Sequence, residues 1–148
     1  MSPEAIIALI GAGVVALTIV VIVLKFALRR APLKPKKKSF VAKWKELQAY
    51  CKDKTTWPQA LESADKLLDR ALVKRGFKGQ SMGERLTNAQ KVLTDNESVW
   101  IAHKLAKKVH EDPATRLREN DVKQALVAIG QALQDLGALP KSSERTNG

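Results

Sequence analysis

The longest apolar run of the chain extends from Ala5 to Leu24 and carries no charged residue across its 20 positions. A helix rises about 1.5 Å per residue, so this run covers roughly 30 Å, the hydrocarbon thickness of a bilayer. A cleaved secretory signal has a basic start and a small-residue exit, whereas Glu4 precedes this run and Lys25 follows it. A helix that stays apolar on every face over this length is also too long to be the core helix of a small domain. The run therefore predicts an uncleaved transmembrane anchor over residues 1–29.

Apolar positions with helical spacing return at Phe40 and continue to Leu136. The first stripe consists of Phe40, Trp44, Leu47 and Cys51. Further helices are expected from Trp57 to about Arg75 and from Met82 to Leu93. A fourth follows Thr94 and stops near Pro113, and a fifth extends from about Asn120 to Leu136. No stretch alternates with period two, so no strand is expected. The predicted fold class is all-α, an N-terminal transmembrane helix followed by a bundle of about five helices.

Helix boundaries are marked by recurrent capping signals. Three pairs have the spacing of a capping box: Thr56 with Gln59, Ser81 with Glu84, and Thr94 with Glu97. Gly76 and Gly137 follow the predicted ends of two helices, where a left-handed residue is common. Gly130 lies inside the last helix, which predicts close contact with a neighbouring helix.

Two positions have alternative interpretations. The basic helix beginning at Phe40 fits either the lipid surface or the domain core, and core packing is favoured. Asp65 falls within the apolar face of the helix that follows Pro58. Because burying an unpaired carboxylate is costly, Asp65 is expected to form an ion pair or a capping interaction.

The charge distribution predicts an orientation for the anchor. One acid, Glu4, precedes the apolar run, and seven cations with no acid among them follow it: Lys25, Arg29, Arg30, Lys34, Lys36, Lys37 and Lys38. The positive-inside rule places this flank and everything after it in the cytoplasm, at the inner face of the plasma membrane. These cations are expected to contact anionic lipid headgroups.

The remaining chain divides into three further segments. Residues 30–38 contain two prolines and no helical periodicity, which predicts an extended basic linker. Residues 39–139 form the cytoplasmic domain, and the polar residues 140–148 form a disordered tail. The single cysteine, Cys51, cannot form an internal disulfide, which fits a reducing compartment.

Partners are suggested by small residues and by charge. Ala8, Ala12 and Ala16 recur every four residues on one face of the anchor, a pattern that permits helix pairing between two copies. In the domain, five cations and one histidine form a candidate contact surface for RNA or a protein: Lys104, Lys107, Lys108, His110, Arg116 and Arg118. Few aromatics accompany them, and the tryptophans fall at core positions, so a protein partner is favoured over nucleic acid.

Several runs of the domain carry a family resemblance: Trp57-Pro58, 64–69, 82–86, 100–105 with His110-Glu111, and 131–137. With these runs, the stretch from Trp57 to Leu139 resembles a group of uncharacterised single-span bacterial proteins. That group is similar to the all-α HEPN superfamily, some of whose members are ribonucleases. The resemblance implies a HEPN-like cytoplasmic bundle and carries no established activity.

The resemblance also identifies where a ribonuclease site would lie. HEPN ribonucleases have an Arg, a polar residue and, four to six residues on, a His, to which His110 corresponds. Lys104 stands where the Arg would be, and lysine lacks the planar fork that clamps phosphate. His110 is instead expected to interact with the carboxyl end of its helix. We therefore predict no catalytic residue, and the domain is interpreted as a non-enzymatic interaction or scaffold module.

The sequence also lacks a pattern for metals or cofactors. His103 and His110 are seven residues apart, about 10.5 Å along a helix, too far for one ion. Asp65 and Asp69 lie one turn apart and do not make a site on their own. No glycine-rich phosphate loop, nucleophile elbow or zinc spacing occurs. No metal site, cofactor site or cofactor is predicted.

Overall fold

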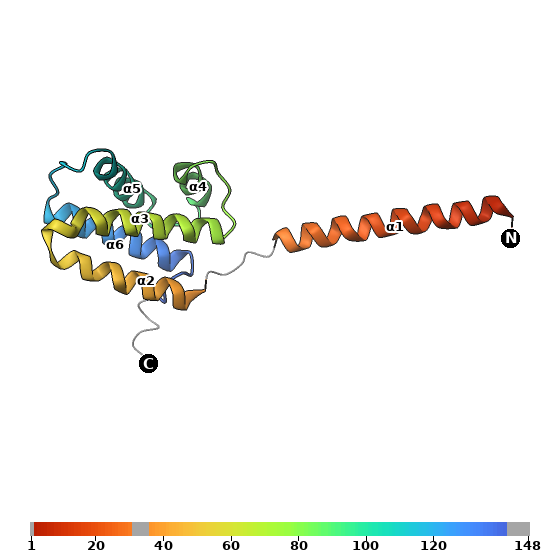
Figure 1. Cartoon of the computed structure of the whole chain (residues 1–148), viewed down its shortest axis with the longest axis horizontal. Helices are drawn as coiled ribbons and strands as arrows, with labels where there is room; N and C mark the ends of the chain where they lie inside the picture. Colours follow the sequence, from red (N-terminus) through yellow and green to blue (C-terminus); the bar gives the residue numbers. More distant parts are fainter. Residues whose placement is uncertain (1, 31–35, 142–148) are drawn as a thin grey trace. The chain divides into compact units, whose positions relative to one another are not determined.

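The computed structural model describes residues 2–30 and 36–141, and the chain divides into two compact units, Met1–Pro32 and Leu33–Gly148. Within the described residues the regular elements are all helical (Figure 1). This confirms the all-α prediction, with one apolar helix at the amino terminus and five helices after it. The elements are α1 (Pro3–Arg30), α2 (Lys37–Ala49), two 3-10 turns (Tyr50–Lys52 and Lys54–Thr56), α3 (Trp57–Lys74), α4 (Met82–Ala89), α5 (Asn96–Glu111) and α6 (Glu119–Asp135).

Helix α1 contains a segment long and apolar enough to cross a membrane. The segment is Pro3–Phe26, 24 residues with a mean hydropathy of 3.1, and none of it is buried. A signal sequence meets the same criterion, but a core helix would be covered by its own domain. Ala8, Ala12 and Ala16 lie within this helix, four residues apart and therefore on one face.

The extended linker predicted over residues 30–38 is shorter than expected. Arg30 is the last residue of α1, and Lys37 and Lys38 form the first turn of α2. The helix begins here because these lysines carry no helix-breaking feature, and Pro35 lies just before it. Lys34 and the rest of the linker's centre, with the greater part of the tail (142–148), lie outside the described residues.

The second unit is built around α3, which contacts each of α2, α4, α5 and α6. In Figure 1, α3 and α6 form a middle layer with α2 on one side and α4 and α5 on the other. The apolar face of α3 is buried along its length: Trp57, Ala60, Leu61, Ala64, Leu67, Leu68, Ala71 and Leu72. The core therefore lies along the broad apolar face of α3, as its sequence periodicity predicts.

Helix α2 belongs to the core, as favoured from the sequence. Phe40 and Leu47 are buried, and Trp44 packs against the core cluster. Cys51 lies beyond the end of α2, in a 3-10 turn, where it is half-buried. A Cβ at Gly130 of α6 would stand 3.0 Å from Cζ2 of Trp44, which confirms the close approach expected at this glycine.

Two of the three predicted caps are wrong. The Thr56 side chain makes no cap bond to α3; its hydroxyl donates to the carbonyl oxygens of Tyr50 and Asp53 instead. Thr94 does not cap α5, because its amide and hydroxyl both bond the Asp135 carboxylate. The cap of α5 is Asp95, whose carboxylate accepts the amide proton of Ser98 at 3.0 Å. In both cases a more favourable partner for the threonine displaced the local capping bond.

The remaining boundaries fall close to prediction. Gly76 and Gly137 have positive φ angles of 87° and 74° at the carboxyl ends of α3 and α6. Ser81 caps α4, as predicted. Helix α4 ends at Ala89, however, so Val92, expected on its apolar face, lies in the following loop and is exposed. Leu93 in the same loop is buried.

Candidate functional site

The basic residues of the predicted contact surface separate into two groups. Lys104, Lys107 and Lys108 are exposed on α5, and the Nζ atom of Lys107 lies 3.9 Å from a carboxylate oxygen of Glu111. Arg116 and Arg118 are exposed in the loop before α6. Lys104 and Lys108 line a common hollow, and neither arginine lines it.

His110 lies in the last turn of α5, where the sequence predicted an interaction with the helix end. Its side chain is 70% exposed, and Nδ1 lies 3.5 Å from a carboxylate oxygen of Glu62 on α3. The structure therefore gives this histidine an acid of a neighbouring helix as its contact.

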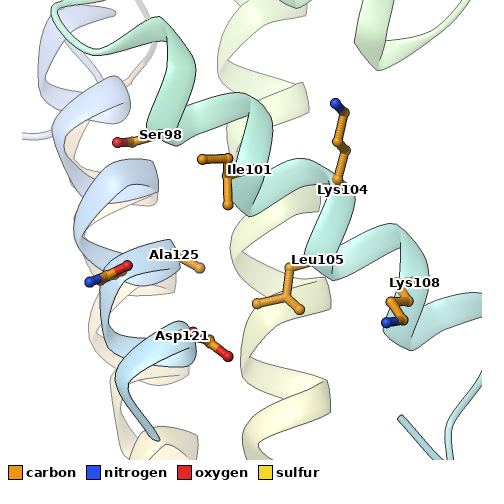
Figure 2. Close-up of a pocket in the computed structure, with 8 residues that line it drawn as sticks. Ser98, Ile101, Lys104, Leu105, Lys108, Asp121 and Ala125 are labelled. Atoms are coloured by element: carbon orange, nitrogen blue, oxygen red, sulfur yellow. The ribbon is translucent and has the colours of Figure 1, made fainter. Parts of the chain in front are cut away.

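A groove between α5 and α6 collects the features that an interaction site needs. Its walls are residues of both helices: Ser98, Ile101, Lys104, Leu105, Lys108, Asp121, Gln124 and Ala125. Figure 2 shows Ile101 and Leu105 on α5 facing Ala125 and Asp121 on α6. The floor is apolar, with lysines on the α5 wall and an acid on the α6 wall.

Ile101 was not assigned a role from the sequence. It is 60% exposed, one of few large apolar side chains of the domain to be so exposed. The buried residues of α5 are Val99, Ala102, Ala106 and Val109, and Ile101 falls outside their stripe. An apolar residue out of phase with the core stripe and three residues before Lys104 was the available signal.

The polar residue expected to need a partner, Asp65, has one. Both of its carboxylate oxygens lie close to Nδ1 of His103, at 3.0 and 3.1 Å. The two side chains are 17% and 16% exposed, respectively, and join α3 to α5. The ring of Trp100 stands edge-on to that of His103, with the centroids 6.1 Å apart. This contact gives Asp65 the side-chain partner that its position in the apolar face required, and it links two helices of the core.

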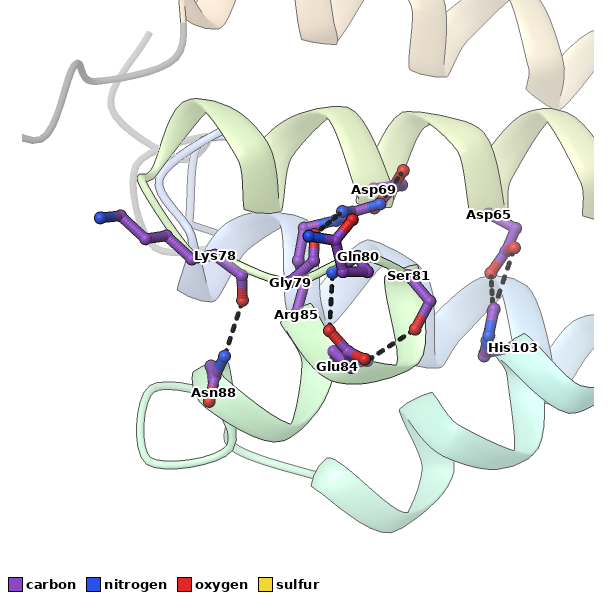
Figure 3. A network of polar contacts seen from close by, with 10 residues as sticks. All are labelled: Asp65, Asp69, Lys78, Gly79, Gln80, Ser81, Glu84, Arg85, Asn88 and His103. Carbon is purple, nitrogen blue, oxygen red and sulfur yellow. Dashed lines mark hydrogen bonds and ion pairs between the residues drawn. The ribbon is translucent and has the colours of Figure 1, made fainter.

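A second polar network fixes the loop between α3 and α4 (Figure 3). Nε and Nη2 of Arg85 donate to the two oxygens of Asp69 at 2.7 and 2.9 Å, and Nη1 donates to the carbonyl of Gly79 at 2.7 Å. The bond to Asp69 raises the pKa of Arg85 above its usual value. Each nitrogen of the guanidinium thus donates one hydrogen bond within the protein, which gives Arg85 a structural role.

One of the two hydrogen bonds of the α4 capping box differs from the usual pattern. The amide of Glu84 donates to the Ser81 hydroxyl at 3.2 Å, as in a capping box. The Glu84 carboxylate accepts from the amide of Gln80 at 2.6 Å, one residue before the cap. Nδ2 of Asn88 donates to the carbonyl of Lys78 at 2.6 Å, and these bonds together hold the loop against α4.

Metal and thiol chemistry find no support in the described residues. No three His, Cys, Asp or Glu side chains in this part of the chain gather as metal ligands would. Burial raises the pKa of the Cys51 thiol, and its Sγ lies 3.5 Å from the carbonyl oxygen of Leu47. A raised pKa keeps the sulfur as a thiol, which is the unreactive form.

Comparison with known proteins gives no relative. No protein-family model matches the chain, and neither the curated proteins nor the solved structures give a match.

Proposed function

We propose that the chain is a membrane-anchored, non-enzymatic interaction module that binds a protein partner in the α5–α6 groove. The partner segment is an amphipathic helix with apolar residues on one face and acidic residues along one edge. Helix-in-groove recognition of this kind uses apolar anchors with charged residues at the rim.

The observation that carries the proposal is Ile101, exposed above a groove whose α5 wall bears Lys104 and Lys108. Exposed large apolar side chains next to a groove mark contact sites, because burying them on binding removes apolar surface from water. The lysines select an acidic partner and orient it, since Asp121 on the opposite wall would repel acids placed there.

The anchor and its orientation complete the proposal. Pro3–Phe26 is taken as the span, with the amino terminus outside and the domain in the cytoplasm. The charge asymmetry between Glu4 and the cations from Lys25 onward supports this orientation. A HEPN-like bundle is part of the same proposal, supported by the order of its amphipathic helices.

RNA binding is the alternative, and the exposed lysines of α5 are the feature that favours it. Glu111 and Glu62 lie beside Lys107 and His110, however, and would repel phosphate at this surface. Lys104 and the missing arginine argue against cleavage of RNA in the manner of the HEPN ribonucleases.

The test is site-specific photocrosslinking in intact membranes. A benzoylphenylalanine in place of Gln124, which lines the groove, is expected to form an adduct whose partner mass spectrometry identifies. The same probe in place of Gln90, an exposed residue after α4, is the matched control and is expected to form none. An adduct with twice the mass of the chain would identify a second copy as the partner.

Two variants distinguish specific binding from chance proximity. Ile101→Asp and the pair Lys104→Glu with Lys108→Glu are each expected to abolish the Gln124 adduct while the domain stays folded. An adduct that persists in both variants would argue against the groove. Steeply salt-dependent RNA binding by the full chain in detergent would favour the alternative, and RNA cleavage lost on His110→Ala would overturn the non-enzymatic assignment.

A further inference from the structure

A second apolar surface lies between α2 and α6. Two hollows there share Val41, Lys45 and Pro140, so they form one continuous surface. We define the α2–α6 face by six of its residues: Lys38, Val41, Trp44, Lys45, Leu126 and Val127. Val127 is 72% exposed, the highest fraction among the large apolar side chains described in the domain.

Charge is segregated on this face. Lys37, Lys38 and Lys45 line its hollows, and neither hollow is lined by an acid. The acid of α2, Glu46, pairs with Lys43 at 3.4 Å, and both line a different hollow, between α2 and α3. The α2–α6 face therefore combines exposed apolar groups with cations alone, which is the combination that binds anionic lipid surfaces.

The position of this face along the chain limits how far it can lie from the span. Six residues separate the end of α1 at Arg30 from the start of α2 at Lys37. A segment of that length reaches at most about 25 Å when fully extended. The lysine-bearing end of α2 is thus tethered within reach of any bilayer that α1 crosses.

We propose that the α2–α6 face docks on the anionic bilayer surface, holding the domain against the membrane. This inference rests on the anchor of the proposed function. Lys38 and Lys45 contact lipid phosphates, and Val127 enters the interfacial region beside Trp44, a residue type enriched there. A second copy does not fit, because pairing this face with itself would set lysines against lysines.

The test measures how close the face comes to lipid in reconstituted full-length chain. Cys51→Ser with Gln48→Cys places a fluorophore on the α2–α6 face, and the matched control carries Gln90→Cys beyond α4. Lipids with a nitroxide near the headgroup are expected to quench the first label in vesicles containing phosphatidylglycerol. Quenching of this label is expected to be weak in vesicles of pure phosphatidylcholine. Quenching of the label at Gln90→Cys is expected to be weak in both kinds of vesicle.

Charge reversal gives a control matched in net charge. Lys38→Glu with Lys45→Glu is expected to reduce quenching to its level in neutral vesicles, whereas Lys104→Glu with Lys108→Glu leaves it unchanged. Resistance to alkaline carbonate extraction reports the anchor separately: loss of it would contradict the span itself. Protein that resists extraction but shows no quenching at Gln48→Cys, or equal quenching at Gln90→Cys, would overturn the docking proposal.

Discussion

Trp44 and Gly130 show how one missing side chain sets the distance between two helices. The indole of Trp44 packs against the backbone of Gly130, and a Cβ at this position would lie 3.0 Å from Cζ2 of the indole. We expect Gly130→Val to destabilise the domain by about 1–3 kcal/mol, since overfilling a packed contact displaces its neighbours. Gln131→Val, an exposed neighbour on α6, is expected to stay within about 0.5 kcal/mol.

Urea unfolding in detergent measures both variants, because the tryptophans, Trp44, Trp57 and Trp100, all lie in the domain and report its unfolding. A double-mutant cycle with Trp44→Leu is expected to reduce the cost of Gly130→Val. An equal cost in both backgrounds would show that the contact with Trp44 is not the cause.

The Asp65–His103 pair is the second residue-scale feature with a measurable consequence. Both side chains are mostly buried, so removing one leaves the other without its partner. His103→Ala is expected to cost about 1–3 kcal/mol. His110→Ala is the matched control, because its exposed side chain is expected to contribute less than about 1 kcal/mol. Equal losses in the two variants would mean that the pair adds nothing beyond a surface contact.

Asp95 gives a pH dependence whose direction can be stated. Its hydrogen bonds to Ser98, through the side chain and then the backbone amide, lower its pKa in the folded state. A lowered pKa contributes stability above the unfolded value of about 4 and loses it as the pH falls through the lower, folded value. Asp95→Asn keeps a capping oxygen but does not titrate. We therefore expect this variant to be less stable than wild type at pH 7 and to lose less stability between pH 5 and pH 2 in urea unfolding. Parallel profiles for the two proteins would contradict the assignment.

At the scale of elements, α4 depends on its surroundings. It has eight residues, too few to be stable alone, and Arg85 ties it to Asp69 of α3 and to the loop at Gly79. Arg85→Lys keeps the charge and loses the fork, so we expect a loss of about 1–3 kcal/mol. Amide hydrogen exchange is expected to increase in α4 more than in α6. Arg116→Lys, at an exposed arginine, is the control and is expected to change neither the stability nor the hydrogen exchange of α4. Unchanged exchange in α4 of the Arg85→Lys variant would rule out this role for Arg85.

The elements were predictable from the sequence to the extent that their signals were local. Apolar periodicity located all five domain helices, and Gly76 and Gly137 marked two ends correctly, because both signals act within a few residues. Thr94 was misassigned because its partner, Asp135, is 41 positions away. The same limit applies to the site: Lys104 and Lys108 were singled out, but the groove also needs Asp121 and Gln124 from another helix. Pairings between distant segments require the fold.

At the scale of the whole molecule, the two units have separate sources of stability. The buried core cluster contains residues from Phe40 to Leu139 and none of the α1 side chains that the structure describes. Removal of residues 1–35 is therefore expected to leave the midpoint of urea unfolding of the domain unchanged, when both forms are measured in the same detergent. The domain is not expected to need α1 for its fold, since a folded state is stabilised by the apolar surface that it buries.

Truncation at the other end provides the contrast. A chain that stops at Asp135 loses Leu136, Ala138 and Leu139, all buried, and with them the bond from the Ala138 amide to the Leu133 carbonyl that closes α6. Burying a leucine side chain contributes about 1.5–3 kcal/mol, so losing two of them removes a large part of a typical domain's stability. This shorter chain is expected to be largely unfolded under conditions in which the chain lacking residues 1–35 is folded. If deleting residues 1–35 proved as damaging as this truncation, α1 would have to be part of the folding unit, and the domain could not be treated as a separate module carried by its anchor.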